Sequence, residues 1–279
     1  MVNGNGKFLI FSVYTINHNV YICFLIRICS VKLAQRTINS IIDENFVFAK
    51  VLDYFGVAFY KYSGHTLEAL CKEKNLPLDK VLRNMERYKP QSQFDKNTIS
   101  TYPVDLIIEY LKHSHHIFIK QKLPYLARLI NGLDQRSAVS KTLADDLKFV
   151  FPLFLEDFIH HVYEEEDTLF AYVNSLYKVQ QGTMPSSKLF YMLESYSIQE
   201  AALDHDHTED ELKGIREITG DYQHNPNNDL HLKVIYEEFK AFDKELVQHA
   251  SIEDEVLFPK ALMLEKSVQE LINRKIRWN

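Results

Sequence analysis

The sequence has few of the residues that break helices. It contains eight glycines and eight prolines among 279 residues. A protein built from many short strands needs turn residues far more often, so this scarcity favours long helices over a turn-rich sheet protein. The three cysteines, Cys23, Cys29 and Cys71, are too few for a disulfide framework, and their spacing does not match a zinc finger. We therefore expect the protein to occupy the reducing cytoplasm.

The sequence also lacks a convincing membrane segment and an excess of positive charge. Its most apolar stretch, residues 8–28, carries Asn17, His18 and Asn19 at its centre, which disfavours a membrane helix. Neither the flanks nor a cleavage site of a signal peptide accompany this stretch. Residues 1–32 are expected to form either a short local strand or hairpin, or a poorly ordered extension. The net charge of −6 argues against a nucleic-acid-binding protein. We expect neither membrane nor nucleic acid as a partner.

Hydrophobic residues make up 46% of the chain, enough to build a globular core. From residue 33 the apolar residues recur every three or four positions, which is typical of helices. Short helical patterns between 33 and 88 predict a small N-terminal domain, in which Gly56 ends one helix and Pro77 begins another. The polar segment 89–103 has a proline near each end and is interpreted as a linker.

Four long amphipathic stretches follow the linker, and segments rich in glycine, proline and asparagine separate them. They cover 104–131, 141–177, 186–219 and 229–266. Four helices joined by short connections predict an antiparallel up-down four-helix bundle. The predicted fold class is therefore all-α, with a small helical domain followed by a bundle over residues 104–270.

A ten-residue pattern occurs twice in the predicted bundle. "HVYEEEDTLF" begins at His161, and "HASIEDEVLF" begins at His249, 88 residues later. Both copies place a glutamate four residues after the histidine, at Glu165 and Glu253, and end in Leu-Phe. Residues four apart lie on the same helical face. Leu169 and Leu257, four residues after the glutamates, continue that face, which is expected to point into the core. Burying a carboxylate without compensation costs several kcal/mol. Two such pairs on core-facing stripes therefore predict a bound cation.

The other two long helices each contribute a histidine, His116 and His205. The intervals from His116 through His161 and His205 to His249 are 45, 44 and 44 residues. In an up-down bundle, such equal intervals place side chains at one height near the middle of the helices. Imidazole and carboxylate ligands suit iron, manganese or zinc. Because structural zinc sites are normally four-coordinate, six ligands favour a pair of metal ions. The candidate metal ligands are His116, His161, Glu165, His205, His249 and Glu253.

These residues resemble those of a known family. The chain is similar to the hemerythrin-like (HHE) cation-binding bundle and, more closely, to the iron–sulfur cluster repair di-iron proteins (RIC family), from about residue 36 to residue 264. The most specific stretches are "SHHIFIKQKLP", "HHVYEEEDTLF", "LDHDHTEDELKGIREIT" and "LVQHASIEDEVLFPKAL". The family's ligand pattern falls on the six candidate residues, with the first histidine assigned to His116 by its distance from Leu123-Pro124.

The resemblance implies two iron ions and a role in repairing iron–sulfur clusters damaged by oxidative stress or nitric oxide. Damaged iron–sulfur proteins would be its clients, with O₂ or NO as small ligands and a homodimer as a further option. In one respect the sequence departs from the family, whose N-terminal domain usually carries an adjacent pair of cysteines. Tyr60 and Lys61 stand at that place here, so a thiol-dependent role of this domain is in doubt.

Other readings of the same residues remain open. The protein could instead be a hemerythrin-like sensor or carrier of O₂ or NO, or a bundle that binds partners without metal, and the residues leave open whether it is an enzyme. Beside the six candidate ligands, the neighbouring histidines are interpreted as surface residues or as hydrogen-bond partners of the ligand histidines; these are His113, His115, His160 and His207. Glu164 and Glu166 are interpreted as solvated charges rather than ligands.

Overall fold

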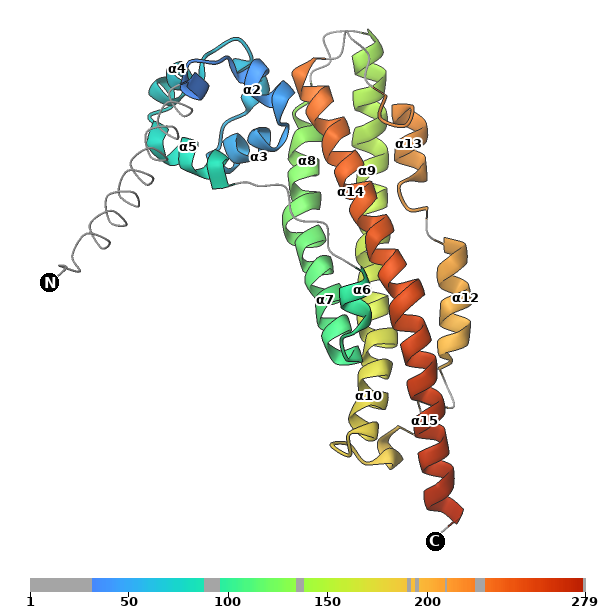
Figure 1. Cartoon of the computed structure of the whole chain (residues 1–279). Helices are drawn as coiled ribbons and strands as arrows, with labels where there is room; N and C mark the ends of the chain where they lie inside the picture. Colours follow the sequence, from blue (N-terminus) through green and yellow to red (C-terminus); the bar gives the residue numbers. More distant parts are fainter. Residues whose placement is uncertain are drawn as a thin grey trace, which may run out of the picture. The chain divides into compact units, whose positions relative to one another are not determined.

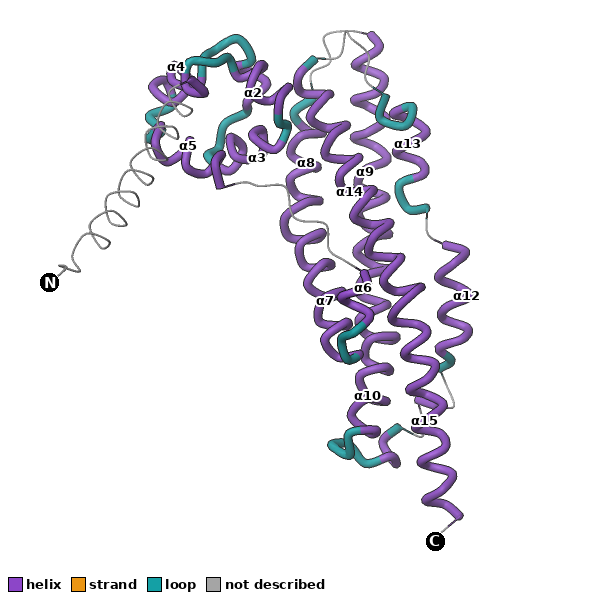
Figure 2. The backbone as a smooth tube through the Cα atoms, in the orientation of Figure 1, coloured by secondary structure: helices purple, strands orange, loops and turns teal. Residues whose placement is uncertain are grey.

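The computed structural model describes residues 32–87, 96–133, 138–189, 192–193, 196–208, 210–223 and 229–277. The extension predicted over residues 1–32 lies almost entirely outside this described part. The prediction of an all-α fold with a helical bundle is confirmed, and the described residues form helices without any named strand (Figures 1 and 2). The chain divides into two compact units, one comprising Met1–Gln91 and Asp229–Val234, the other Ser92–Asn228 and Ile235–Asn279.

In the described residues before the bundle, the first unit has short named helical elements around a small apolar core. They are α2 (Ile38–Glu44), α3 (Val47–Tyr54), the 3-10 helix η1 (Phe59–Tyr62), α4 (Leu67–Glu73) and α5 (Leu78–Arg87). Thr37 and Thr66 cap α2 and α4, because each hydroxyl accepts a hydrogen bond from a backbone N–H three residues ahead. After α3 the chain reverses at Gly56, whose φ of +74° favours glycine. Cys71 is buried in α4 and acts as a core residue.

Tyr60, which the resemblance aligns with one of the family's paired cysteines, is partly buried in the first unit. Its ring stacks on the imidazole of His231, which belongs to the same unit, with the centroids 3.7 Å apart and the planes 2° from parallel. Burial is the main cause that raises the pKa of the Tyr60 phenol. Tyr60 is therefore held in an aromatic stack and offers no thiol at this position.

The second unit is the four-helix bundle, and its helices alternate in direction (Figure 1). Its first helix comprises α7 (Val104–Ile117), η2 (Phe118–Lys122) and α8 (Leu123–Asn131), and its second comprises α9 (Ala138–Glu165), η3 (Glu166–Phe170) and α10 (Ala171–Gln180). The third comprises α12 (Ile198–Thr208) and α13 (Lys213–Thr219), and the fourth comprises α14 (Leu230–Ile252), η5 (Glu253–Leu257) and α15 (Phe258–Arg277). The first residues of α14, up to Val234, belong to the first unit.

Two details of the bundle differ from the helices predicted from the sequence. The stretch 186–219 is not one helix: it starts with the 3-10 turn η4 (Ser186–Lys188) and breaks again between α12 and α13, where Leu212 turns into the core. The segment 89–103 contains the short helix α6 (Lys96–Ser100), and its Ile99 is fully buried. Lys96 also binds the bundle, since its Nζ lies 2.5 Å from Glu255 Oε2.

The bundle core has two apolar regions. One is made of leucine, isoleucine and valine from α7, α10 and α15 with Phe170 and Phe258. The other is a group of stacked and edge-on aromatic rings, which are Phe118, Phe151, Phe154, Phe158, Phe239 and Phe242. The polar residues described next lie between these regions and are therefore shielded from water.

Candidate metal centre

In the described part of the chain, three of the four bundle helices contain a π-helical turn close to the candidate metal ligands. The segments η2, η3 and η5 each span five residues. The segment η2 begins two residues after His116, η3 begins directly after Glu165, and η5 begins at Glu253. The N–H groups of Leu123 and Phe258 bond to the carbonyls of Phe118 and Glu253, five residues back. π-Turns inside α-helices are rare and are found mostly at functional sites.

A proline helps to explain two of these turns. Pro124 and Pro259 follow directly after Leu123 and Phe258, the residues that close η2 and η5. A proline has no N–H to donate, and its ring clashes with the carbonyl four residues back, so a wider turn relieves both problems. The Leu-Pro and Phe-Pro pairs were thus a sequence signal for the π-turns. No proline follows η3.

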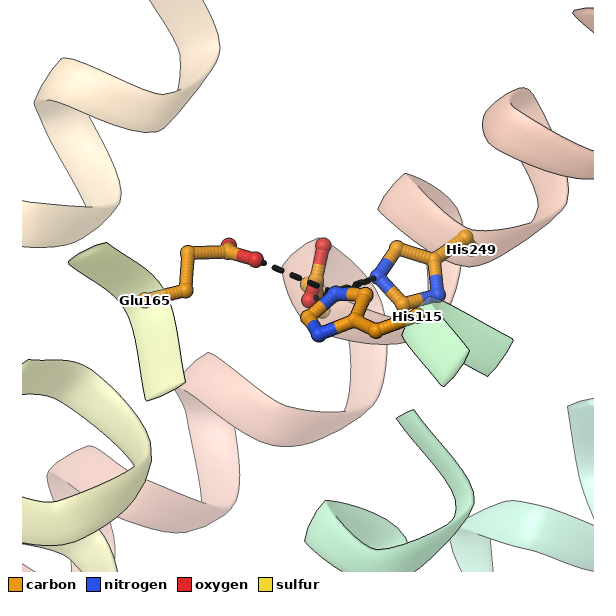
Figure 3. A group of neighbouring side chains, drawn as sticks. His115, Glu165 and His249 are labelled. Atoms are coloured by element: carbon orange, nitrogen blue, oxygen red, sulfur yellow. Dashed lines mark hydrogen bonds and ion pairs between the residues drawn. The ribbon is translucent and has the colours of Figure 1, made fainter. Parts of the chain in front are cut away.

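Four buried side chains converge beside these turns: His115, Glu165, His249 and Glu253. One ligand-type atom from each lies within 4.8 Å of all the others. The Nε2 atom of His115 is 2.9 Å from Nε2 of His249 and 3.3 Å from Oε2 of Glu165 (Figure 3). Nε2 of His249 lies 3.1 Å from Oε1 of Glu253. Three separate helices therefore bring nitrogen and oxygen atoms to one buried point.

Glu166 fixes the orientation of His115. Its Oε1 accepts a hydrogen bond from Nδ1 of His115 at 3.0 Å, and Lys112 pairs with its other oxygen at 3.8 Å. An ionised carboxylate can only accept, so Nδ1 carries a proton; Nε2 points at His249 and Glu165, where it could offer a lone pair to a bound cation once its own proton is lost. A histidine bound to a metal is usually held in this way by a carboxylate on its other nitrogen.

The electrostatics of the cluster favour positive charge. Burial opposes protonation of His115, but the hydrogen bond and charge of Glu165, the charge of Glu253 and the bond to Glu166 outweigh it, so the pKa of His115 is raised. Glu165 and Glu253 are 6% and 1% exposed, and buried carboxylates without compensating charge are strongly destabilising. The cluster therefore fits a cation.

The donor set also fits a transition metal. Two nitrogen donors that bind one ion at about 2.1 Å and at right angles lie roughly 3 Å apart, which matches the separation of the two Nε2 atoms. Imidazole and carboxylate donors without a thiolate suit iron, manganese or zinc. The residues present could therefore hold such an ion.

A cavity of about 390 Å³ leads from this cluster toward the surface. Its inner wall carries His115, Glu165, His249 and Glu253, and apolar residues such as Phe158 and Leu246 flank them. Its outer part is lined by acidic side chains, which are Asp210, Glu211, Asp243, Asp254 and Glu255. The cavity thus gives ions or small molecules a polar path to an otherwise buried centre.

The six residues nominated from the sequence occupy different positions. Glu165, His249 and Glu253 belong to the buried cluster. His161 is 34% exposed and lies at the cavity, with its Nε2 3.8 Å from Glu165 Oε2. His205 lies in α12, but its side chain is outside the described part. His116 is exposed, and the structure brings its neighbour His115 into the cluster instead.

A signal for His115 was present in the sequence. Ile108, Leu111, His115 and Phe118 follow one another at intervals of three and four, so His115 continues the apolar stripe of α7. His116 falls instead in line with Lys112 and Lys120, on the polar face. The pattern within the helix therefore identified the buried ring, whereas spacing from Leu123-Pro124 did not. Glu166 and Glu211 were also missed, because their contacts come from other helices.

Comparisons with known proteins support the resemblance seen in the motifs. No family model matches the chain. It is 21% identical over 197 residues to proteins named iron-sulfur cluster repair protein YtfE from Yersinia pseudotuberculosis serotype IB (strain PB1/+) and from Yersinia pestis (strain Pestoides F). The matches cover 71% of this chain and 83% of each relative. The predicted similarity to iron–sulfur cluster repair proteins is thus confirmed.

Within the described part of the chain, no helix combines the length and the apolar character needed to cross a bilayer.

Proposed function

We propose that this protein is a non-haem di-iron protein that helps to restore iron–sulfur clusters damaged by oxidative stress or nitric oxide. The observation that carries the proposal is the buried cluster of two histidines and two glutamates, formed by three helices at π-turns. The similarity to relatives named for iron–sulfur cluster repair gives the cluster its biological context. Damaged iron–sulfur proteins in the cytoplasm are the proposed clients.

The proposed centre has two sides that share Glu165. On the inner side lie His115, His249 and Glu253, and on the cavity side lies His161. Oε2 of Glu165 is 3.3 Å from Nε2 of His115 and 3.8 Å from Nε2 of His161, so one carboxylate faces both rings. This arrangement supports a bridging role for Glu165. His205 remains a proposed ligand from the third helix.

Iron bound at such a centre would supply redox chemistry, binding of diatomic molecules and a store of transferable metal ion. The protein residues have separate tasks. Glu166 holds the Nε2 lone pair of His115 toward the centre, and the rings of Phe118 and Phe170 cover His249 and His115 against water. The acidic lining of the cavity attracts cations and lowers their energy along the path.

The experiment that tests this function has two steps. Protein purified without oxygen is expected to contain two iron ions per chain, measured by metal analysis and Mössbauer spectroscopy. It is then mixed with an iron–sulfur protein whose cluster has been damaged by nitric oxide, and recovery of the cluster is followed by its absorbance. Recovery with loaded protein, and none with metal-free protein, is the expected result.

The alternatives predict different outcomes in the same two steps. A hemerythrin-like carrier or sensor of O₂ or NO would contain iron and give similar spectra, but it would transfer no iron to the client. A bundle that binds partners without metal would contain far less than one iron ion per chain. Either result would contradict cluster repair as the function.

A further inference from the structure

The strongest feature outside the nominated ligands is a carboxylate on the cavity side of the centre. Glu211 lies in the turn that separates α12 (Ile198–Thr208) from α13 (Lys213–Thr219). Its Oε1 is 3.9 Å from Nε2 of His161, almost the same as the 3.8 Å between that nitrogen and Oε2 of Glu165. The imidazole of His161 is therefore flanked by two carboxylates from different helices.

The turn that carries Glu211 is held firmly in place. On one side of Glu211, Asp210 pairs with Arg216, whose guanidinium also donates two hydrogen bonds of 2.8 and 2.7 Å to Asp243 on α14. On the other side, Leu212 is 1% exposed and packs into the core. Because both neighbours are anchored, the backbone at Glu211 is already ordered, and the turn does not have to become ordered when this side chain binds an ion.

The described lining of the cavity carries little positive charge from arginine or lysine. Among the side chains that line it in the described residues, Arg216 is the only arginine or lysine, and two aspartates already neutralise it. A divalent cation beside His161 would therefore meet the carboxylates of Glu165 and Glu211 with little opposing charge. Carboxylate and imidazole together form a set of donors typical of iron, manganese and zinc sites.

We propose that Glu211 is an additional metal ligand, which completes the cavity-side half of the centre together with His161 and Glu165. The proposal rests on the proposed function, since it assumes a centre with two metal ions. It makes the two halves unequal. The inner half uses side chains that are 2–10% exposed, whereas His161 and Glu211 are 34% and 23% exposed. The ion held by Glu211 is the more accessible of the two and exchanges first.

The test is a titration of metal-free protein with Fe²⁺ without oxygen, in competition with a chelator that changes colour on binding iron. The unaltered protein is expected to bind two ions with different affinities. In Glu211→Gln the weaker ion should bind at least about 10-fold more weakly, while the tighter ion keeps its affinity. The unchanged tighter ion also shows that the variant is folded.

Two further variants separate binding by Glu211 from a general effect of charge. Asp254→Asn removes one negative charge from the same cavity and should leave both affinities within about twofold of the unaltered protein. Glu211→Asp keeps the charge but withdraws the carboxylate, and it should resemble Glu211→Gln. If Asp254→Asn weakens the second ion as much as Glu211→Gln does, or if Glu211→Asp binds it normally, Glu211 acts only through its charge and the proposal is wrong.

The titration also separates this inference from the proposed function. Two ions bound equally well by the unaltered protein and by Glu211→Gln would reject Glu211 as a ligand and leave a di-iron centre intact. Binding of one ion or none by the unaltered protein would reject the di-iron centre, and the role of Glu211 with it.

Discussion

The two copies of the His-x-x-x-Glu pattern share the histidine, the glutamate and the final Leu-Phe, but their surroundings differ. His249 is 10% exposed, whereas His161 is 34% exposed. The first helix supplies the difference, because Phe118 and His115 pack against His249, with ring centroids 5.6 and 4.7 Å away. His161 instead faces the cavity beside the break in the third helix. A local pattern thus selects which residues share a helical face, and neighbouring helices decide how deeply that face is buried.

The residue after each glutamate extends this comparison. Glu166 follows Glu165 and bonds to His115, whereas Asp254 follows Glu253 and is exposed at the cavity. Glu166, which orients His115 in the buried half of the centre, therefore belongs to the His161 copy, whose histidine is the more exposed of the two. The two copies depend on each other, and neither would form a complete site alone.

The largest effect is expected at the carboxylate that faces both halves. Glu165→Gln should reduce iron content from two ions to less than one per chain, because it removes a negative charge shared by His115 and His161. Glu164→Gln is the matched control, since Glu164 is exposed and its loss should leave iron content unchanged. Metal analysis after purification without oxygen measures both. Equal iron content in the two variants would contradict the prediction that Glu165, and not Glu164, faces the metal centre.

The paired histidines of the first helix give the next effect. His115→Ala should lose most of the iron, because it removes a buried donor 2.9 Å from His249. His116→Ala should retain iron and change the free energy of unfolding by no more than about 0.5 kcal/mol, because its side chain is exposed. Metal analysis and chemical denaturation test the pair. The reverse order of effects would restore His116 as the ligand.

Replacing each of the two repeated histidines with alanine tests directly whether the buried half of the centre holds iron more tightly than the exposed half. After a wash with chelator, His161→Ala should keep about one iron ion per chain, since the inner donors remain. His249→Ala should keep much less than one, because only the exposed half remains and it binds weakly. The iron retained after a fixed washing time is the measurement. Similar retention by both variants would mean that burial does not distinguish the halves.

A smaller effect is expected at Glu166, which orients a ligand without belonging to the proposed ligand set. Glu166→Ala should weaken binding of the tighter ion by about 10- to 100-fold, the usual effect of losing the partner of a metal-bound histidine. Glu166→Gln should recover part of this loss, because its amide oxygen can still accept the Nδ1 hydrogen bond. Competition with a chelator measures the affinity. Equal binding by the Ala and Gln variants would show that the hydrogen bond does not matter.

Much of the fold could be predicted from the sequence because helix periodicity is local. The apolar spacing identified the four bundle helices, and the threonine caps and Gly56 marked ends in the small unit. The break between α12 and α13 was not predicted, since it depends on Leu212 and Arg216 meeting other helices. The helix α6 was missed because its polar sequence becomes helical only with Ile99 buried against the bundle.

The candidate site divides in the same way. The sequence by itself nominated Glu165, His249 and Glu253, because a repeat with four-residue spacing places charged side chains on a stripe that must be buried. The apolar stripe of α7 favoured His115 over His116, but only the tertiary structure set the different depths of the two halves and brought Glu166 and Glu211 to the histidines. These contacts join residues about 50 or more positions apart in the chain, and distances across a bundle are fixed by packing rather than by helical periodicity.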